Sequence, residues 1–125
     1  MKRKARPRRQ RKTTRAQLAR KADKLWSTLV RSRGACEMCG STKVLQGAHG
    51  FPRTYRGTRW SPLNGWCLCR RCHVLMTYRP LAWTDWMVEQ LGQPVYDELR
   101  RLAQTTAKPD LEKIIASLEA ELGRA

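Results

Sequence analysis

The chain has 125 residues, which is enough for one small domain. Its formal net charge is +16, and the charge is uneven: residues 1–24 hold 12 of the 26 Lys and Arg residues, whereas residues 81–125 hold 8 of the 10 Asp and Glu residues. A basic front and an acidic tail indicate a polyanionic partner, and we expect nucleic acid. No apolar run approaches the ~20 residues that span a bilayer, and no apolar segment follows the basic start. We therefore expect no membrane partner and a cytoplasmic location.

The first segment is almost entirely Lys and Arg. Like charges at this density repel one another, so residues 1–13 are predicted to form a disordered basic arm that becomes ordered when it binds phosphate groups. The arm residues expected to contact nucleic acid are Lys2, Arg3, Lys4, Arg8 and Arg9. From Thr14 onward, apolar residues recur at spacings of three and four as far as Val30. This pattern predicts a packing helix with a solvated basic face, ended by Gly34.

The middle of the chain predicts two short strands around a basic loop. The strands are expected at residues 43–49 and 64–68, and the loop at residues 50–62 contains several Gly and Pro residues. The loop also carries Tyr55 and Trp60, which we expect to touch nucleic acid. A helix is predicted from Arg70 to Tyr78, with Pro80 ending it.

Three more helices are expected after Pro80. The first is predicted at residues 86–91, with a cap at residues 84–85, and the second at residues 94–107. The third is predicted in the last segment, with Pro109 in its first turn. The last helix has an apolar stripe that suits docking on the domain or on a partner helix, so a homodimer through this helix is one expectation. The predicted organisation is an arm at 1–13, a domain at 14–107 and a C-terminal helix at 108–125.

Four of the five cysteines form two Cys-x-x-Cys pairs. Cys36, Cys39, Cys69 and Cys72 have the spacing of a four-thiolate structural zinc site, with 29 residues between the pairs. Such a site contributes folding energy, so chelation should unfold the domain. Cys67 could be an alternative ligand, but its position on the strand favours a buried apolar residue.

Residues 69–73 also match the Cys-x-x-Cys-His pattern of haem attachment, but haem attachment generally needs export and would leave the other pair unexplained. Ala48-His49, then Asn64, then residues 69–73 together resemble the HNH endonuclease family in its zinc-containing form. Asn64 precedes His73 by nine residues, which is the usual spacing in that family. The resemblance covers residues 25–105 and is strongest to small phage or prophage members.

The resemblance implies an α+β fold, a ββα-metal finger, and cleavage of duplex or branched DNA in a bacterial host cell. His49 would be the general base, and His73 would bind a catalytic divalent ion such as Mg²⁺, Mn²⁺ or Ni²⁺. Asn64 would hold the loop that aims His49, or lie near the ion. The basic residues that would contact phosphates are Arg53, Arg56, Arg59, Arg70 and Arg71.

The chain departs from the family pattern where a second metal ligand is usual. Many members have His or Asp directly before the general base, whereas this chain has Ala48. Gln46 and Thr77 stand at two other positions where relatives have a ligand. These departures leave His73 as the one clear ligand of the catalytic ion. They support an alternative, a non-catalytic zinc-ribbon protein that binds nucleic acid on a degenerate HNH scaffold.

Overall fold

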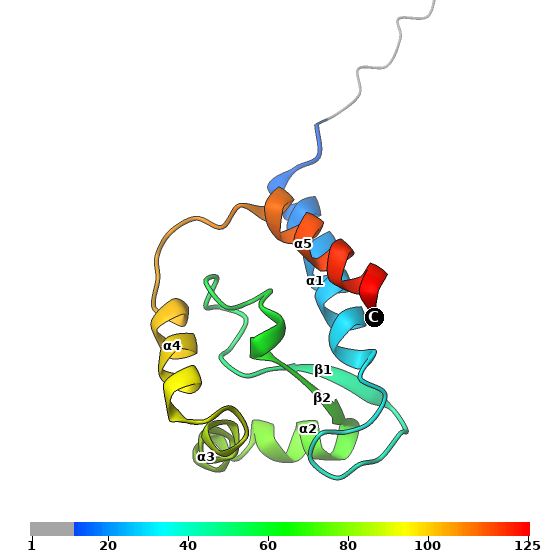
Figure 1. Cartoon of the computed structure of the whole chain (residues 1–125), viewed down its shortest axis with the longest axis vertical. Coiled ribbons are helices and arrows are strands. Elements are labelled where there is room, and N and C mark those ends of the chain that lie inside the picture. Colours follow the sequence, from blue (N-terminus) through cyan, green and yellow to red (C-terminus); the bar gives the residue numbers. More distant parts are fainter. Residues whose placement is uncertain (1–11) are drawn as a thin grey trace, which may run out of the picture.

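The fold consists of five α-helices and one β-hairpin within residues 12–125, the part of the chain that the computed structural model describes (Figure 1). In chain order the elements are α1 (Arg15–Arg31), β1 (Leu45–His49), the short 3-10 helix η1 (Pro62–Asn64), β2 (Gly65–Cys69), α2 (Arg70–Thr77), α3 (Pro80–Leu91), α4 (Gln93–Ala103) and α5 (Leu111–Arg124). The mixed fold with one small sheet confirms the α+β class. Residues 1–11, and with them Lys2, Arg3, Lys4, Arg8 and Arg9, lie outside the described residues.

The hairpin is the centre of the molecule. β1 and β2 pair antiparallel, with Leu45 opposite Cys69 and His49 opposite Gly65. One face of the hairpin packs on α1 and the other on α2 and α3, so both faces are covered. At Gly65, a Cβ atom would overlap the side chain of Val30 on α1. A glycine is therefore needed here for the helix to lie directly on the sheet.

The last helix packs along α1 (Figure 1). Its apolar stripe buries Leu111, Ile115 and Leu118 in the same core as Trp26. Of the two uses predicted for this stripe, the structure has docking on the rest of the domain, which removes the apolar face from solvent within the chain. A homodimer stays a prediction, but the stripe no longer supports it.

Several helix ends differ from the predictions. The N-cap of α1 is Thr14, as predicted, and its Oγ1 accepts from the Gln17 amide at 3.2 Å. α2 ends at Thr77, close to the predicted end at Tyr78, but Pro80 also begins α3, because the first turn of a helix needs no amide hydrogen from its first residues. The predicted start at residues 84–86 was therefore wrong. α4 ends at Ala103 rather than at 107, and α5 begins after Asp110, its N-cap, rather than at Pro109.

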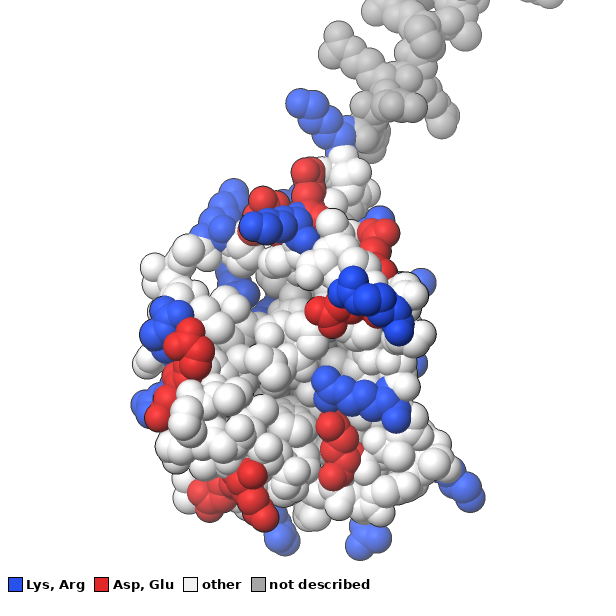
Figure 2. Space-filling model, in the orientation of Figure 1, with Lys and Arg blue, Asp and Glu red and all other residues white. Residues whose placement is uncertain are grey.

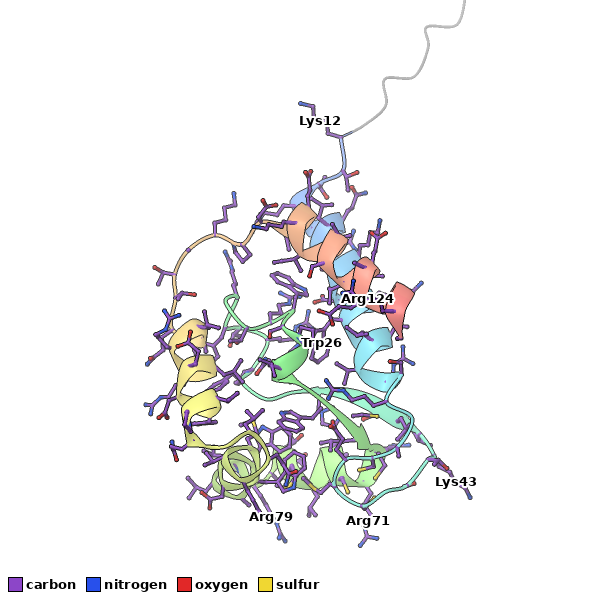
Figure 3. All side chains as sticks on the ribbon, in the orientation of Figure 1. Lys12, Trp26, Lys43, Arg71, Arg79 and Arg124 are labelled. Carbon is purple, nitrogen blue, oxygen red and sulfur yellow. The ribbon has the colours of Figure 1, made fainter. Side chains whose placement is uncertain are left out.

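The surface of the described residues carries charges of both signs (Figure 2). No helix within residues 12–125 combines the length and the apolar character needed to cross a bilayer. Blue and red side chains alternate over much of the face in Figure 2, and blue ones project from its lower edge. Figure 3 labels three basic residues near that edge, Lys43, Arg71 and Arg79, far from Lys12 at the start of the described chain.

Candidate functional site

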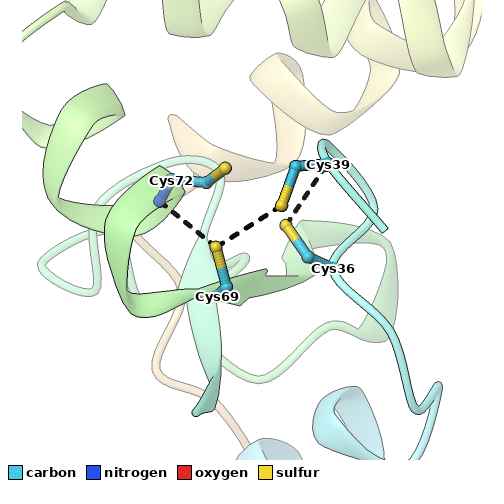
Figure 4. A group of neighbouring side chains, drawn as sticks. All are labelled: Cys36, Cys39, Cys69 and Cys72. Carbon is cyan, nitrogen blue, oxygen red and sulfur yellow. Dashed lines mark hydrogen bonds between the residues drawn. The ribbon is translucent and has the colours of Figure 1, made fainter. Parts of the chain in front are cut away.

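The four paired cysteines converge at one point. Their sulfur atoms all lie within 4.8 Å of one another, where the turn at residues 36–40 meets the junction of β2 and α2 (Figure 4). Cys69 is the N-cap of α2, and its Sγ accepts from the Cys72 amide at 3.5 Å. Cys36 Sγ accepts from the Cys39 amide at the same distance. The four thiols could hold a metal ion such as zinc, which agrees with the predicted ligand set.

The pKa values of two of these thiols move in opposite directions. Although burial raises the pKa of Cys36, backbone hydrogen bonds from Cys69, Cys39 and Met38 lower it to about 6. Burial, followed by contacts with the other three cysteines, raises the pKa of Cys72. Sulfur atoms this close cannot all ionise without a cation between them. A divalent metal ion at this point would let all four become thiolates.

Glu37 fastens the first cysteine pair to the hairpin. Its amide donates to the Cys67 carbonyl at 2.8 Å, and its carboxylate accepts from the Cys67 amide at 2.7 Å. Arg33 pairs with the same carboxylate at 2.9 Å. Cys67 itself is 0% exposed, packs in the core beside Trp26, and does not belong to the four-sulfur group. The prediction that Cys67 is a buried residue is confirmed.

His49 is held on two sides at the end of β1. Its ring stacks on Trp26 with 3.9 Å between centroids and 9° between planes. Its Nε2 lies 3.0 Å from the Arg59 carbonyl oxygen, which can only accept, so Nε2 carries the hydrogen. Nδ1 then keeps a lone pair. His49 is half-buried and lines a cavity.

The surroundings of His49 keep its ring neutral. Burial lowers the pKa of His49, and this outweighs the hydrogen bond to Arg59 and the charge of Asp23, which raise it. A neutral ring whose Nδ1 keeps its lone pair is able to accept a proton.

Asn64 holds the backbone that follows His49. The side chain is 0% exposed, its Oδ1 accepts from the Phe51 amide at 2.7 Å, and its Nδ2 donates to the Phe51 carbonyl at 3.0 Å. Its own carbonyl accepts from the Gly50 amide at 2.8 Å. Three hydrogen bonds therefore fix the two residues after β1. This arrangement matches one of the two roles that the HNH resemblance implies for Asn64.

His73 lies on α2 and contacts β1 through Gln46. His73 Nδ1 is 2.7 Å from Gln46 Oε1, and an amide oxygen accepts, so Nδ1 carries the hydrogen and Nε2 has the lone pair. Burial lowers the pKa of His73 as well. Sequence reasoning treated Gln46 only as a poor metal ligand and missed this contact. The signal was its place on the strand: Gln46 lies two residues before Ala48 and therefore on the same face of the strand as Ala48.

Both histidines line one cavity of about 340 Å³. Its wall is largely apolar and comes from the loop after β1 and from α2, α3 and α4. The lining residues other than the histidines include Phe51, Met76, Trp83, Met87 and Tyr96. No carboxylate lines this cavity, and Ala48 is 2% exposed. Within residues 12–125, the four cysteines are the only group of three or more His, Cys, Asp or Glu side chains placed to share an ion.

Asp23 organises the basic loop, and sequence reasoning did not single it out. Its carboxylate accepts from Arg59 at 2.7 and 3.0 Å and from Trp60 Nε1 at 2.8 Å. Trp60 is only 6% exposed, so the expectation that it touches nucleic acid is wrong. Arg59 is largely neutralised by this ion pair. A lone acid within a stretch of Lys and Arg offers no local signal for a contact 36 residues away.

The remaining predicted phosphate contacts stay at the surface. Arg53 is exposed, although its Nη2 forms a 3.4 Å ion pair with the Asp23 carboxylate. Arg56 is exposed as well. Arg70 and Arg71 are exposed at the start of α2. Their positions leave these four charges accessible to a polyanion. Tyr55, unlike Trp60, is 45% exposed.

Comparison of the chain with models of protein families, with curated proteins and with solved structures found no match.

Proposed function

We propose that this protein is a metal-dependent DNA endonuclease of the HNH type. The observation that carries the proposal is the fixed tautomer of His49: Nε2 donates to the Arg59 carbonyl, Nδ1 keeps its lone pair, and the residue lines the same cavity as His73. A histidine that only filled space would not need both a fixed ring and a free lone pair beside a second histidine. The hairpin, the following helix and the Asn64 contacts are the context that such a base requires.

In the proposed reaction, His49 Nδ1 takes a proton from a water molecule as the water oxygen attacks the phosphorus of a phosphodiester. The bond from phosphorus to the 3′ oxygen breaks, the 3′ oxygen takes a proton from solvent, and the products are a 5′ phosphate and a 3′ hydroxyl. The Trp26 stack and the Arg59 carbonyl keep the imidazole in one orientation throughout. Fixing the base in this way lowers the cost of reaching the reactive geometry.

His73 would hold the divalent ion through Nε2, because Gln46 already accepts the hydrogen of Nδ1. When bound, the ion supplies charge neutralisation at the scissile phosphate and the departing oxygen. One protein ligand with waters and substrate phosphate suits a hard ion such as Mg²⁺. Zinc at the four cysteines would have a structural role.

A second candidate is a zinc-ribbon protein that binds nucleic acid without cutting it. The specific observation in its favour is the cavity wall, in which Ala48 is buried and no carboxylate is present. This candidate keeps the zinc, the fold and the basic surface, and it predicts no turnover with any divalent ion.

Plasmid nicking by the purified, zinc-loaded chain separates the two. We expect Mg²⁺-, Mn²⁺- or Ni²⁺-dependent conversion of supercoiled plasmid to nicked circles, and a loss of at least 100-fold in rate for His49→Ala, which is the usual contribution of a general base. DNA binding by His49→Ala should stay close to that of the unchanged protein. Equal nicking by both proteins would mean a contaminating nuclease, and no nicking by either would leave the binding protein as the function.

A further inference from the structure

A second hollow, of about 390 Å³, lies where three distant segments of the chain meet. The first turns of α1, the basic loop and the linker between α4 and α5 each contribute a cation to it. The residues that line it are Arg15, Ala16, Ala19, Arg56, Arg59, Lys108 and Leu111. None of them is acidic. Four positive side chains around one open hollow make a site for an anion.

Specific contacts hold the three segments together. Arg15 Nη2 donates to the Pro109 carbonyl at 3.0 Å, which brings the linker onto the start of α1. Gly57 packs so closely on the end of α4 that a Cβ atom there would overlap the Leu102 carbonyl oxygen. This contact holds the basic loop next to the linker. The arrangement of Arg56 and Lys108 therefore follows from the packing of the backbone.

Three of the four cations keep their charge available. Arg59 is paired with Asp23 at 2.7 Å, whereas Arg15, Arg56 and Lys108 form no ion pair within residues 12–125. In Figure 2, blue side chains, with a few red ones, border a hollow at the upper left of the molecule. Placing cations together without acids costs free energy through repulsion, and a bound polyanion offsets that cost.

The basic loop links this hollow to the histidine cavity. Residues 50–52 line the cavity, and Arg56 and Arg59 line the hollow. Arg59 connects the two, because its carbonyl oxygen contacts His49, which lines the cavity, while Arg59 itself lines the hollow. A strand with regularly spaced phosphates can follow the loop from one to the other, whereas a small anion would use only one of them.

We infer that Arg15, Arg56 and Lys108 form a phosphate-binding cradle that holds the backbone of a nucleic-acid strand beside the histidine cavity. The inference rests on the proposed function for the identity of the partner. It adds two residues, Arg15 and Lys108, that the sequence did not single out, and it gives the strand a path along residues 50–62.

Salt-dependent binding tests the cradle. The probe is a fluorescein-labelled DNA duplex, titrated with the zinc-loaded full chain at several NaCl concentrations with no other divalent ion added. Each phosphate contact contributes about 0.9 to the slope of log K against log salt. The double variant Arg56→Ala/Lys108→Ala should therefore lower the slope by about 2. The control Lys43→Ala/Arg124→Ala removes two exposed charges elsewhere and should lower it by less than half as much.

The charge-preserving variant Arg56→Lys/Lys108→Arg should keep the slope of the unchanged protein. Equal losses in the double variant and its control would overturn the cradle, because binding would then follow net charge alone. No binding of the duplex by the unchanged protein would overturn it too. Binding through the cradle without plasmid nicking would support the cradle and contradict the endonuclease. Plasmid nicking by the unchanged protein, together with an unchanged salt slope in the double variant, would support the endonuclease and contradict the cradle.

Discussion

Asn64 forms two hydrogen bonds with the backbone of a single residue, Phe51, at 2.7 and 3.0 Å. The amide of the side chain thus pairs with the peptide group of Phe51 as a strand partner would. It does so at a point where β1 has already ended at His49. The pairing extends the order of the hairpin by two residues and fixes the start of the basic loop.

Replacement of Asn64 by Ala should destabilise the protein by about 2–4 kcal/mol, since two hydrogen bonds at a buried site are lost and the Phe51 peptide loses both of its partners there. Urea unfolding followed by circular dichroism measures the change. Asn64→Asp is the matched variant: it can still accept from the Phe51 amide but can no longer donate. We also expect a larger loss in nicking than in DNA binding. A loss below 0.5 kcal/mol for Asn64→Ala would contradict the role assigned to this side chain.

Removal of metal from the four-cysteine group should unfold the domain, because a structural zinc ion contributes its binding free energy to folding. A strong chelator should lower the melting temperature steeply, and added Zn²⁺ should restore it. Cys39→Ser should lose bound zinc, as measured by elemental analysis. Cys67→Ala is the control, because this buried cysteine lies outside the group and its replacement should leave one zinc per chain. Retention of zinc by Cys39→Ser would contradict the ligand set.

Both histidines should titrate below pH 6.5 in the folded protein. Burial lowers the pKa of His49 and of His73 from that value. The chain has two histidines in all, so two imidazole signals in a proton NMR titration suffice, and His49→Ala and His73→Ala assign them. Because the unfolded chain binds protons at a higher pH than the folded one, stability should fall as the pH drops through the window just below 6.5. A pKa for His49 above 6.5 would contradict its burial.

Gly57→Ala should destabilise the protein by about 1–3 kcal/mol, as expected when an added methyl group meets packed backbone. The methyl group would meet the Leu102 carbonyl oxygen and displace the basic loop from α4. Gly123→Ala is the control. Its Cβ would have nothing within 4 Å, and it lies in α5, where alanine is favoured by about 0.5–1 kcal/mol. Thermal unfolding of the two variants should therefore give shifts of opposite sign.

Short-range patterns in the sequence were enough to predict α1, the hairpin and the cysteine ligand set. Each depends on residues within one helix turn, one strand or one Cys-x-x-Cys pair, and the structure has them at nearly the predicted positions. The start of α3 was missed because proline has two opposite meanings: it ends a helix at its interior and begins one at its first turn. Only tertiary packing decides between them.

The contacts that the sequence could not predict are those between distant segments. Asp23 meets Arg59 and Trp60 across 36 and 37 residues, and Arg15 meets Pro109 across 94. The local pattern of a basic helix does not show whether an acidic residue will form an ion pair with an arginine of a distant loop or face water. The apolar periodicity of α5 was visible, but its partner helix was not.

The hydrogen bond between His49 and the carbonyl oxygen of Arg59 has a consequence for mutagenesis. The acceptor belongs to the backbone, so every residue type at position 59 supplies the same oxygen. Alanine scanning of the loop would score Arg59 only for its side chain and would overlook the group that orients His49. The orientation of His49 is thus insensitive to substitutions at Arg59 that preserve the path of the loop, and it is sensitive to insertions or deletions anywhere within residues 50–62.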